Sequence, residues 1–281
     1  MKFTKMHGAG NDFVVVQAAG EERDWARLAT ALCDRHFGVG ADGLLLALPS
    51  ERADVRMRMF NPDGTESEMC GNGIRCLAKF AVERGLAAPR DGTVTVETAP
   101  GVMACQLFGE GGRVERVRVS MGVPELAPSR IPVAFEGPPP VKDLPLSVDG
   151  ASYLVTCVSM GNPHAVYFME TPVEEFPLET EGPKVERHPA FPRRVNFGVA
   201  RVLDRARMEL RVWERGAGAT LACGSGACAA VVAARLHDLV DGRVDVRLPG
   251  GTLTIEWDGR GEVFMTGPAT AVFEGEWLLP A

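Results

Sequence analysis

Short hydrophobic or alternating segments recur along the whole chain, and most have the length of β-strands rather than of helices. At 55–59, for example, valine and methionine alternate with arginine, as in a strand with one buried face. Glycine-, proline- or asparagine-containing turns separate many of these segments. The predicted strands are 3–7, 13–17, 44–48, 55–59, 94–97, 102–107, 114–119, 153–158, 165–168, 194–202, 208–213, 244–248, 252–257 and 263–265.

Apolar residues recur at helical spacing in only three segments. The first follows Asp24, a potential N-cap, and ends near Gly38. The other two each follow a cysteine and two nearby glycines, in Cys70-Gly71-Asn72-Gly73 and Cys223-Gly224-Ser225-Gly226. Their apolar residues are Ile74, Leu77, Ala78, Ala81 and Val82 after the first cysteine, and 227 and 229–234 after the second.

The two halves of the chain repeat each other. Gly10-Asn11 matches Gly161-Asn162 at a shift of 151, and the cysteine–glycine segments match at a shift of 153. Val94–Glu97 matches Val244–Arg247 at a shift of 150, and Asn61 corresponds to Asn196. Four landmarks in one order predict two similar domains, each mostly strands around one central helix.

We therefore expect an α+β fold of two pseudo-symmetric domains, each a mostly antiparallel sheet or barrel-like roll around its helix. The boundaries are 1–120 for the first domain, with 268–281 returning to it, and 121–267 for the second. Seven prolines fall within 121–150. This composition favours a crossing between domains, with short edge strands.

Composition narrows the function. The chain has 281 residues, 46% hydrophobic and 24% charged, with a net charge of −7 and no basic cluster, which disfavours nucleic acid and anionic membranes as partners. Its N-terminus lacks the apolar run of a signal peptide, and no helical segment is long enough to span a bilayer. Seven cysteines in a chain without an export signal predict reduced thiols in the cytoplasm.

A cysteine at a helix start meets unsatisfied backbone N–H groups and the positive end of the helix dipole, which lower the pKa of a thiol. Two domains related by a pseudo-twofold axis can present two such cysteines, Cys70 and Cys223, to one substrate. One thiolate would remove a proton from carbon while the opposite thiol delivers a proton to the other face. The helix-start N–H groups would stabilise the carbanion. The pattern indicates inversion of a stereocentre.

Several segments together resemble the diaminopimelate epimerase family. They are Met6–Phe13, Asn61–Gly64, Glu68–Cys76, Gly161–His164, Val195–Phe197, Trp213–Gly218 and Ala222–Gly226, with 267–269 a weaker match. The resemblance runs in order from the N-terminus to about Cys228, and the second cysteine segment with its Glu-Arg prefix is the most specific part of it.

This resemblance implies interconversion of LL- and meso-2,6-diaminopimelate in lysine and peptidoglycan-precursor synthesis, without pyridoxal phosphate, another cofactor or a metal. It also implies a cytoplasmic homodimer. Cys223 would accept the proton and Cys70 donate one in the LL-to-meso direction, with His164 and Glu214 tuning the pKa values of the thiols. The substrate-binding residues implied are Asn11, Asn61, Gly71, Asn72, Asn162, Asn196, Glu214, Arg215, Gly224 and Ser225. Some relatives carry glutamine at the position of Gly43, so we assign no side-chain contact there.

Other interpretations remain open at this stage. Free cysteines are usually buried and inert, and we expect this of Cys33, Cys76, Cys105, Cys157 and Cys228. The cysteine spacings are too wide for the usual close zinc pair, and no Walker-type lysine follows the glycines. The main alternatives are a two-thiol racemase of the proline racemase kind and a thiol redox or metal-binding protein. Replacement of either cysteine by alanine separates the epimerase from the last class.

Overall fold

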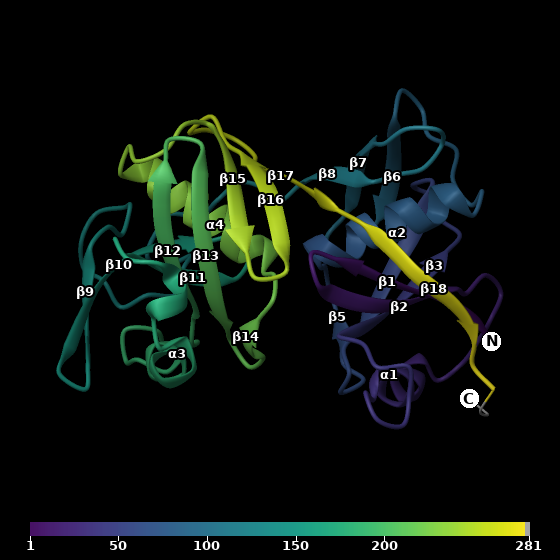
Figure 1. Ribbon diagram of the computed structural model, residues 1–281, viewed down its shortest axis with the longest axis horizontal. Coiled ribbons are helices and arrows are strands. Elements are labelled where there is room, and N and C mark those ends of the chain that lie inside the picture. The colour runs from purple at the N-terminus through teal and green to yellow at the C-terminus, as the bar shows by residue number, and fades with distance from the viewer. Residues whose placement is uncertain (279–281) are drawn as a thin grey trace. The chain divides into compact units, whose positions relative to one another are not determined.

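The computed structural model describes residues 1–278, which form two compact units (Figure 1). Unit 1 comprises Met1–Ser120 and the segment that begins at Thr266, and unit 2 comprises Met121–Met265. The mixed, mostly antiparallel pairing with few helices is the predicted α+β class.

Unit 1 is built from strands that surround one helix. Its elements are β1 (Lys2–Gly8), β2 (Asn11–Gln17), α1 (Trp25–Cys33), β3 (Gly43–Leu48), β4 (Val55–Phe60), β5 (Glu66–Ser67), α2 (Gly71–Glu83), β6 (Thr93–Glu97), β7 (Val102–Phe108), β8 (Arg116–Ser120) and β18 (Thr270–Glu276). α2 contacts strands β1 to β4, β6 to β8 and β18. A second layer forms where Trp25, Leu28 and Leu32 of α1 pack against β3 and its neighbours.

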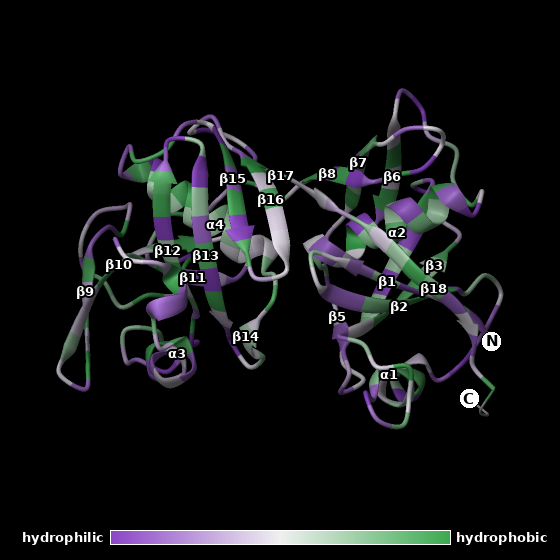
Figure 2. Ribbon diagram, in the orientation of Figure 1, coloured by the Kyte–Doolittle hydropathy of each residue, from purple (hydrophilic) through white to green (hydrophobic). Residues whose placement is uncertain are grey.

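Unit 2 repeats this plan. Its elements are β9 (Leu144–Val148), β10 (Ala151–Ser159), β11 (Pro163–Phe168), a 3-10 turn η1 (Val173–Glu175), α3 (Leu178–Glu186), β12 (Asn196–Asp204), β13 (Arg207–Glu214), β14 (Gly218–Thr220), α4 (Gly224–Leu236), β15 (Arg243–Leu248), β16 (Gly251–Glu256) and the start of β17 (Phe264–Pro268). Polar and apolar residues alternate along β13, whose central position in the sheet places one face on the core (Figure 2).

The pairing confirms the sequence repeat strand by strand. β1 and β2 form an antiparallel hairpin, β2 runs parallel to β3, β3 pairs antiparallel with β4, β4 runs parallel to β6, and β6 pairs antiparallel with β7. In unit 2 the same sequence of pairings links β10, β11, β12, β13, β15 and β16. The turn after the first strand and the start of the central helix therefore occupy equivalent positions in the folds of the two units.

Both central helices are buried, which explains their composition. Residues 71–81 of α2 are buried throughout, and so are 226–234 of α4. α4 is rich in alanine, and small side chains allow strands to pack close to it on several sides. Each central helix therefore begins inside the core of its unit, directly after its cysteine.

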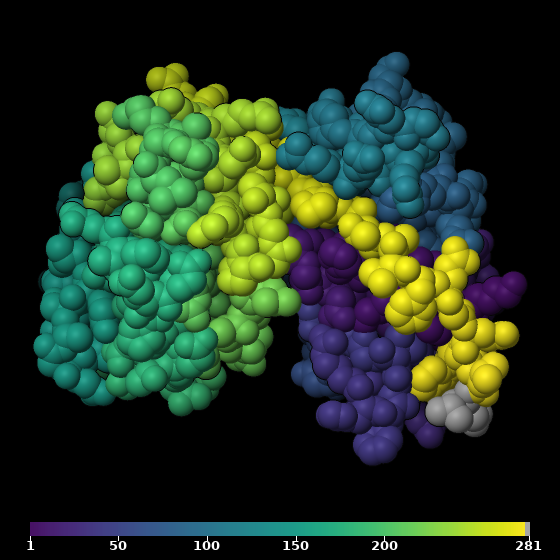
Figure 3. All heavy atoms as spheres, viewed as in Figure 1, coloured from purple at the N-terminus to yellow at the C-terminus, as the bar shows by residue number. Residues whose placement is uncertain are grey.

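Three local expectations were wrong or incomplete. The proline-rich segment is not a bare crossing between domains, because its Ile131, Val133 and Val141 are buried in the core of unit 2. α3 was not predicted, since Gly182 and Pro183 within it are helix-breaking residues. The C-terminal strand β18 was also missed, and it pairs with β1 from Lys2↔Glu276 to His7↔Thr270. Figure 3 shows this last segment, in yellow, on the surface of unit 1. Within residues 1–278, no helix is long and apolar enough to cross a membrane.

Candidate active site

Cys70 is the N-cap of α2. Its extended backbone, with φ −138° and ψ 118°, directs the side chain back over the first turn, where the Gly73 N–H donates to the sulfur at 3.4 Å. A Cβ on Gly73 would lie 3.2 Å from Leu45 and 3.4 Å from the Cys70 Cβ, so glycine keeps this turn close to its neighbours. Cys70 is the one cysteine of the seven that is not fully buried.

Two asparagines contact this cysteine or its helix turn. The Cys70 thiol lies 3.8 Å from Asn11 Oδ1, and the Asn72 amide donates to the same oxygen at 3.1 Å. Asn72 Oδ1 in turn accepts from the Arg75 guanidinium at 2.9 Å. The structure thus brings together Cys70, Asn11 and Asn72, three of the residues singled out in the sequence.

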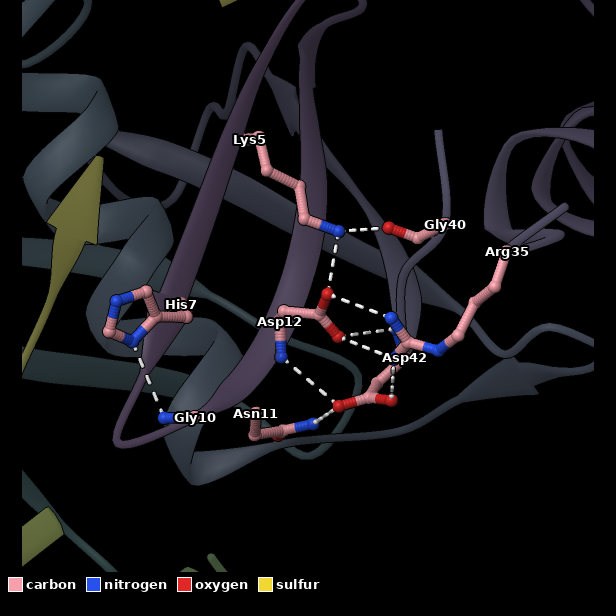
Figure 4. A network of polar contacts seen from close by, with 8 residues as sticks. All are labelled: Lys5, His7, Gly10, Asn11, Asp12, Arg35, Gly40 and Asp42. Atoms are coloured by element: carbon pink, nitrogen blue, oxygen red, sulfur yellow. Dashed lines mark hydrogen bonds and ion pairs between the residues drawn. The ribbon is translucent and has the colours of Figure 1, made fainter. Parts of the chain in front are cut away.

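A charged cluster lies behind Asn11 (Figure 4). The Asn11 amide donates to Asp42 Oδ2 at 2.8 Å, and Arg35 donates to both Asp12 and Asp42. Lys5 forms an ion pair with Asp12 at 2.6 Å. Although burial raises the pKa of Asp12, hydrogen bonds from Arg35 and Lys5 outweigh it and lower that pKa to about 2. Asp12 is therefore ionised at neutral pH, and the contacts of the cluster fix the loop that carries Asn11.

Asn61 and Gly43 lie in their own local settings. Asn61 follows β4, and its amide donates to Thr65 Oγ1 at 3.0 Å within the 61–65 turn, outside the Asn11–Asn72 cluster. A Cβ on Gly43 would lie 3.1 Å from both Met59 Cε and Phe60 O, which is tighter than most such contacts. A larger residue at Gly43 would therefore require its neighbours to shift.

Cys223 occupies the equivalent position in unit 2. It is the N-cap of α4, and its sulfur accepts from the Gly226 N–H at 3.3 Å. Ser225 Oγ lies 3.6 Å from the sulfur. Unlike Cys70, Cys223 is 4% exposed. The two cysteines share one backbone setting but differ in their access to solvent.

Asn162 and His164 extend from Ser225 into the core. The Asn162 amide donates to Ser225 Oγ at 3.3 Å, and Asn162 Oδ1 lies 3.0 Å from His164 Nε2, which must donate the proton of that hydrogen bond. His164 is 1% exposed. Burial, with a smaller contribution from the charge of Arg215, lowers the pKa of His164 to about 3. His164 is therefore neutral at pH 7 and contacts the cysteine through Asn162 and Ser225.

Glu214 and Arg215 lie at the end of β13, and Asn196 begins the neighbouring strand β12. The Arg215 N–H donates to Asn196 Oδ1 at 2.8 Å, and the exposed Arg215 side chain donates to Arg193 O at 2.9 Å. Glu214 accepts from Thr220 Oγ1 at 2.6 Å and also forms a hydrogen bond with Cys223. Unit 2 thus brings Asn162, His164, Asn196, Glu214, Arg215 and Ser225 together around Cys223.

Comparisons with known proteins identify the family of the chain. Residues 3–127 and 156–272 match the family described as diaminopimelate epimerase. The chain belongs to this family. It is 53% identical over 281 residues to the diaminopimelate epimerase of Pelotomaculum thermopropionicum, covering 99% of each chain. It is also 53% identical to that of Moorella thermoacetica, covering 99% of this chain and 100% of the relative.

Solved structures with the same fold have much lower sequence identity. A probable proline racemase from Agrobacterium radiobacter K84, with bound carbonate, has a TM-score of 0.71 at 15% identity and covers 99% of this chain and 93% of its own. A phenazine biosynthesis protein of the PhzF family from Bacillus anthracis has a TM-score of 0.68 at 19% identity and covers 99% of each chain. At this identity the likeness establishes the fold of this epimerase-family chain and nothing more.

The electrostatics of Cys223 correct one expectation. We expected the start of α4 to lower the thiol pKa, but the pKa of Cys223 is raised well above its usual value. Burial is the largest cause and the negative charge of Glu214 comes next, so together they exceed the lowering effect of Ser225 and the Gly226 N–H. In this family member Cys223 is therefore a neutral thiol at pH 7.

The other five cysteines are buried, as expected of packing residues. Burial raises the pKa values of Cys33, Cys76, Cys105 and Cys157 to about 12. Within residues 1–278, no group of three or more His, Cys, Asp or Glu side chains is arranged to hold a metal ion.

Two residues that support Asn11 and Asn72, Arg75 and Asp42, were not predicted from the sequence. Arg75 is 0% exposed and also donates to Gly71 O at 3.0 Å. The spacing of Arg75 could have indicated its buried position. It lies four residues after Gly71 and three before Ala78, so the three residues share a face of the helix that is buried. Asp42 carried a weaker signal, as a carboxylate between glycines in a loop.

Proposed function

We propose that the chain epimerises LL-2,6-diaminopimelate to the meso isomer and back, using Cys70 and Cys223 as its two acid–base groups. The observation that carries this is the equivalent placement of two cysteines, each the N-cap of the central helix of a repeated unit and each accepting a hydrogen bond from the third residue beyond it. The family membership supplies the substrate.

In the proposed reaction, one sulfur takes the α-proton and the other thiol donates a proton to the opposite face of the same carbon. Each proton moves between carbon and sulfur, so no oxidant, reductant or pyridoxal phosphate takes part. In the LL-to-meso direction Cys223 is the acceptor and Cys70 the donor, and the roles exchange in reverse. Because the pKa of Cys223 is raised, the thiol must first release its proton to solvent water, and the positive ammonium groups of the arriving substrate would favour this ionisation.

Backbone groups at the helix starts would stabilise the carbanion. The first N–H groups of a helix have no intrahelical acceptor, and this applies to residues 71–72 and 224–225. We propose that these positions bind the carboxylate at the reacting carbon, where negative charge increases in the transition state. The Gly73 and Gly226 N–H groups are directed at sulfur and would stabilise each thiolate as it forms.

The distant end of the substrate requires groups that distinguish two similar termini. We propose that Arg215 holds its carboxylate, since guanidinium can bind carboxylate through two hydrogen bonds. The amides of Asn11, Asn61, Asn162 and Asn196, together with Glu214, would hold the remaining carboxylate and ammonium groups. Glu214 also tunes Cys223 directly, and His164 does so indirectly as a neutral hydrogen-bond donor.

The test is α-proton exchange and epimerisation of LL-diaminopimelate in deuterated water, in enzyme freed of pyridoxal phosphate. Cys70→Ala and Cys223→Ala should each lose epimerisation by more than about 10²-fold, the least expected for removal of one acid–base group. Cys76→Ala and Cys228→Ala remove buried thiols from the same two helices and are matched controls that should retain it. Epimerisation that survives either of the first two changes would refute the two-thiol mechanism.

We further propose that the chain forms a cytoplasmic homodimer that serves lysine and peptidoglycan-precursor synthesis. We also propose that the two units are two domains whose boundaries in the sequence are 120/121 and 267/268. The half-exposed Val272 and Phe273 of β18 offer an apolar surface for a second copy. Sedimentation should give twice the chain mass of 30.1 kDa, and a monomer at micromolar concentration would contradict the dimer.

A further inference from the structure

A continuous chain of side-chain hydrogen bonds runs beneath Cys70. Arg75 donates to Asn72 Oδ1 at 2.9 Å, Asn72 donates to Asn11 Oδ1 at 3.1 Å, and Asn11 donates to Asp42 Oδ2 at 2.8 Å. All four residues belong to unit 1. The fixed end points are a buried guanidinium and a carboxylate that also accepts from the Asp12 N–H and from Arg35.

The chemistry of the two ends fixes the direction of the whole chain. Guanidinium can only donate hydrogen bonds, and an ionised carboxylate can only accept them. Each intervening amide must therefore present oxygen toward Arg75 and NH2 toward Asp42. If Asn11 turned over, its oxygen would face Asp42 and its NH2 would face the Asn72 NH2, so both contacts would be lost.

This direction determines what Cys70 encounters. The oxygen of Asn11, which can only accept, lies 3.8 Å from the Cys70 sulfur. A thiol can donate to that oxygen, whereas a thiolate would be repelled by it. The opposite orientation would present NH2 and favour the thiolate.

We propose that Asp42 and Arg75 are positioning residues that hold the Asn11 oxygen against Cys70 and so keep Cys70 protonated before substrate binds. The role rests on the proposed function, in which Cys70 begins the LL-to-meso reaction as the proton donor. Both residues act through the orientation of the Asn11 amide.

Other charged or titratable groups on the surrounding elements have to be considered. They include Lys5 and His7 on β1, Asp12 on β2, Arg35 before β3, Arg58 on β4, Glu66 on β5, Glu68 before α2, and Arg75 and Lys79 on α2. Lys5, Arg35 and Asp12 are paired with one another or with Asp42, and Arg58 is paired with Glu66. The test therefore compares substitutions that change the amide chain with one that removes a carboxylate elsewhere.

The measurement is the rate of Cys70 alkylation by iodoacetamide against pH, read by peptide mass mapping in full-length Cys223→Ser protein. This measurement follows the Cys70 thiol and not turnover. The positioning role can therefore be refuted while the proposed function stands, and the proposed function can be refuted while the positioning role stands. Asn11→Ala removes the acceptor oxygen. We expect the pH midpoint of Cys70 alkylation to fall by about 0.5 to 1 unit, the equivalent of one hydrogen bond.

Asp42 is tested by two substitutions. Asp42→Ala removes the acceptor that fixes Asn11 and should lower the midpoint by a smaller amount, whereas Asp42→Asn retains an acceptor oxygen and should restore the wild-type value. Asp54→Ala is the matched control, since Asp54 also accepts two hydrogen bonds, from Thr95, in the same unit. It should leave the midpoint unchanged, with folding checked by thermal melting.

Each result bears on the proposal. A midpoint that rises in Asn11→Ala would mean that NH2 faces the sulfur, and an unchanged midpoint would mean that Asn11 does not control Cys70. Either result overturns the proposal. If Asp42→Ala and Asp54→Ala shift the pH midpoint of Cys70 alkylation equally, Asp42 does not act specifically through Asn11, and the proposal is wrong for Asp42.

Discussion

The buried His164 should make unit 2 lose stability in mild acid. Burial lowers the pKa of His164 to about 3 in the folded chain, whereas an unfolded histidine titrates near pH 6.5. Below pH 6.5 the unfolded chain therefore binds a proton that the folded chain excludes. The stabilisation is complete above pH 6.5 and declines as pH falls from 6.5 toward 3.

The size of the loss follows from the difference in pKa. A pH of 4.5 lies two units below the pKa of the unfolded histidine, and each unit corresponds to about 1.36 kcal/mol of free energy. The wild-type chain should therefore lose about 2.7 kcal/mol between neutral pH and pH 4.5 from this one residue. His164→Gln keeps a side chain that can donate to Asn162 but does not titrate.

Urea unfolding followed by circular dichroism at pH 7 and pH 4.5 measures this difference. Any constant effect of His164→Gln cancels, because each protein is compared with itself at two pH values. His36→Gln, at an exposed histidine, is the matched control and should follow the wild type. If the wild type and His164→Gln lose the same free energy of unfolding, the buried neutral imidazole is not the cause.

Three shorter predictions follow from the same contacts. Glu214→Gln removes the negative charge that raises the pKa of Cys223, so the pH midpoint of Cys223 alkylation should fall; a rise would contradict that assignment. In Gly226→Ala the new Cβ would lie 3.1 Å from the Cys223 sulfur, and kcat should drop at least tenfold while the protein still folds. Asp24→Ala removes a cap that accepts from the Arg27 N–H at 3.0 Å and should cost about 1 kcal/mol in urea unfolding without changing kcat.

Much of the fold could be predicted because the repeat and the strand patterns are local signals. The sequence places Cys70 and Cys223 at helix starts, and the structure makes both of them N-caps. β18 and α3 could not be predicted in the same way. β18 depends on pairing with β1 at the opposite end of the chain, and α3 tolerates Gly182 and Pro183 through tertiary packing that local propensity does not contain.

The identity of the candidate site residues could be predicted from the sequence, but the protonation state of Cys223 could not. The sequence identifies Asn11, Asn72 and Cys70, and the structure brings them together. The pKa of Cys223 was predicted in the wrong direction, because a helix start is visible in sequence whereas burial and the approach of Glu214 are not. The position of Arg75 one helical turn after Gly71 is visible in the sequence, but its complete burial and its contact with Pro268 O appear only when α2 is packed.

The two cysteines differ where the repeat has diverged. In unit 1 an amide oxygen from the first hairpin faces sulfur, whereas in unit 2 the equivalent asparagine, Asn162, reaches sulfur only through Ser225. Cys70 is partly accessible and contacts a neutral acceptor, while Cys223 is buried beside a carboxylate. The two ammonium groups of the substrate would offset the negative charge of Glu214, which raises the pKa of Cys223. They would have a smaller effect at Cys70, where the neighbouring acceptor is a neutral amide oxygen. Substrate binding should therefore lower the pKa of Cys223 selectively, so that one duplicated helix start supplies the base and the other retains its proton.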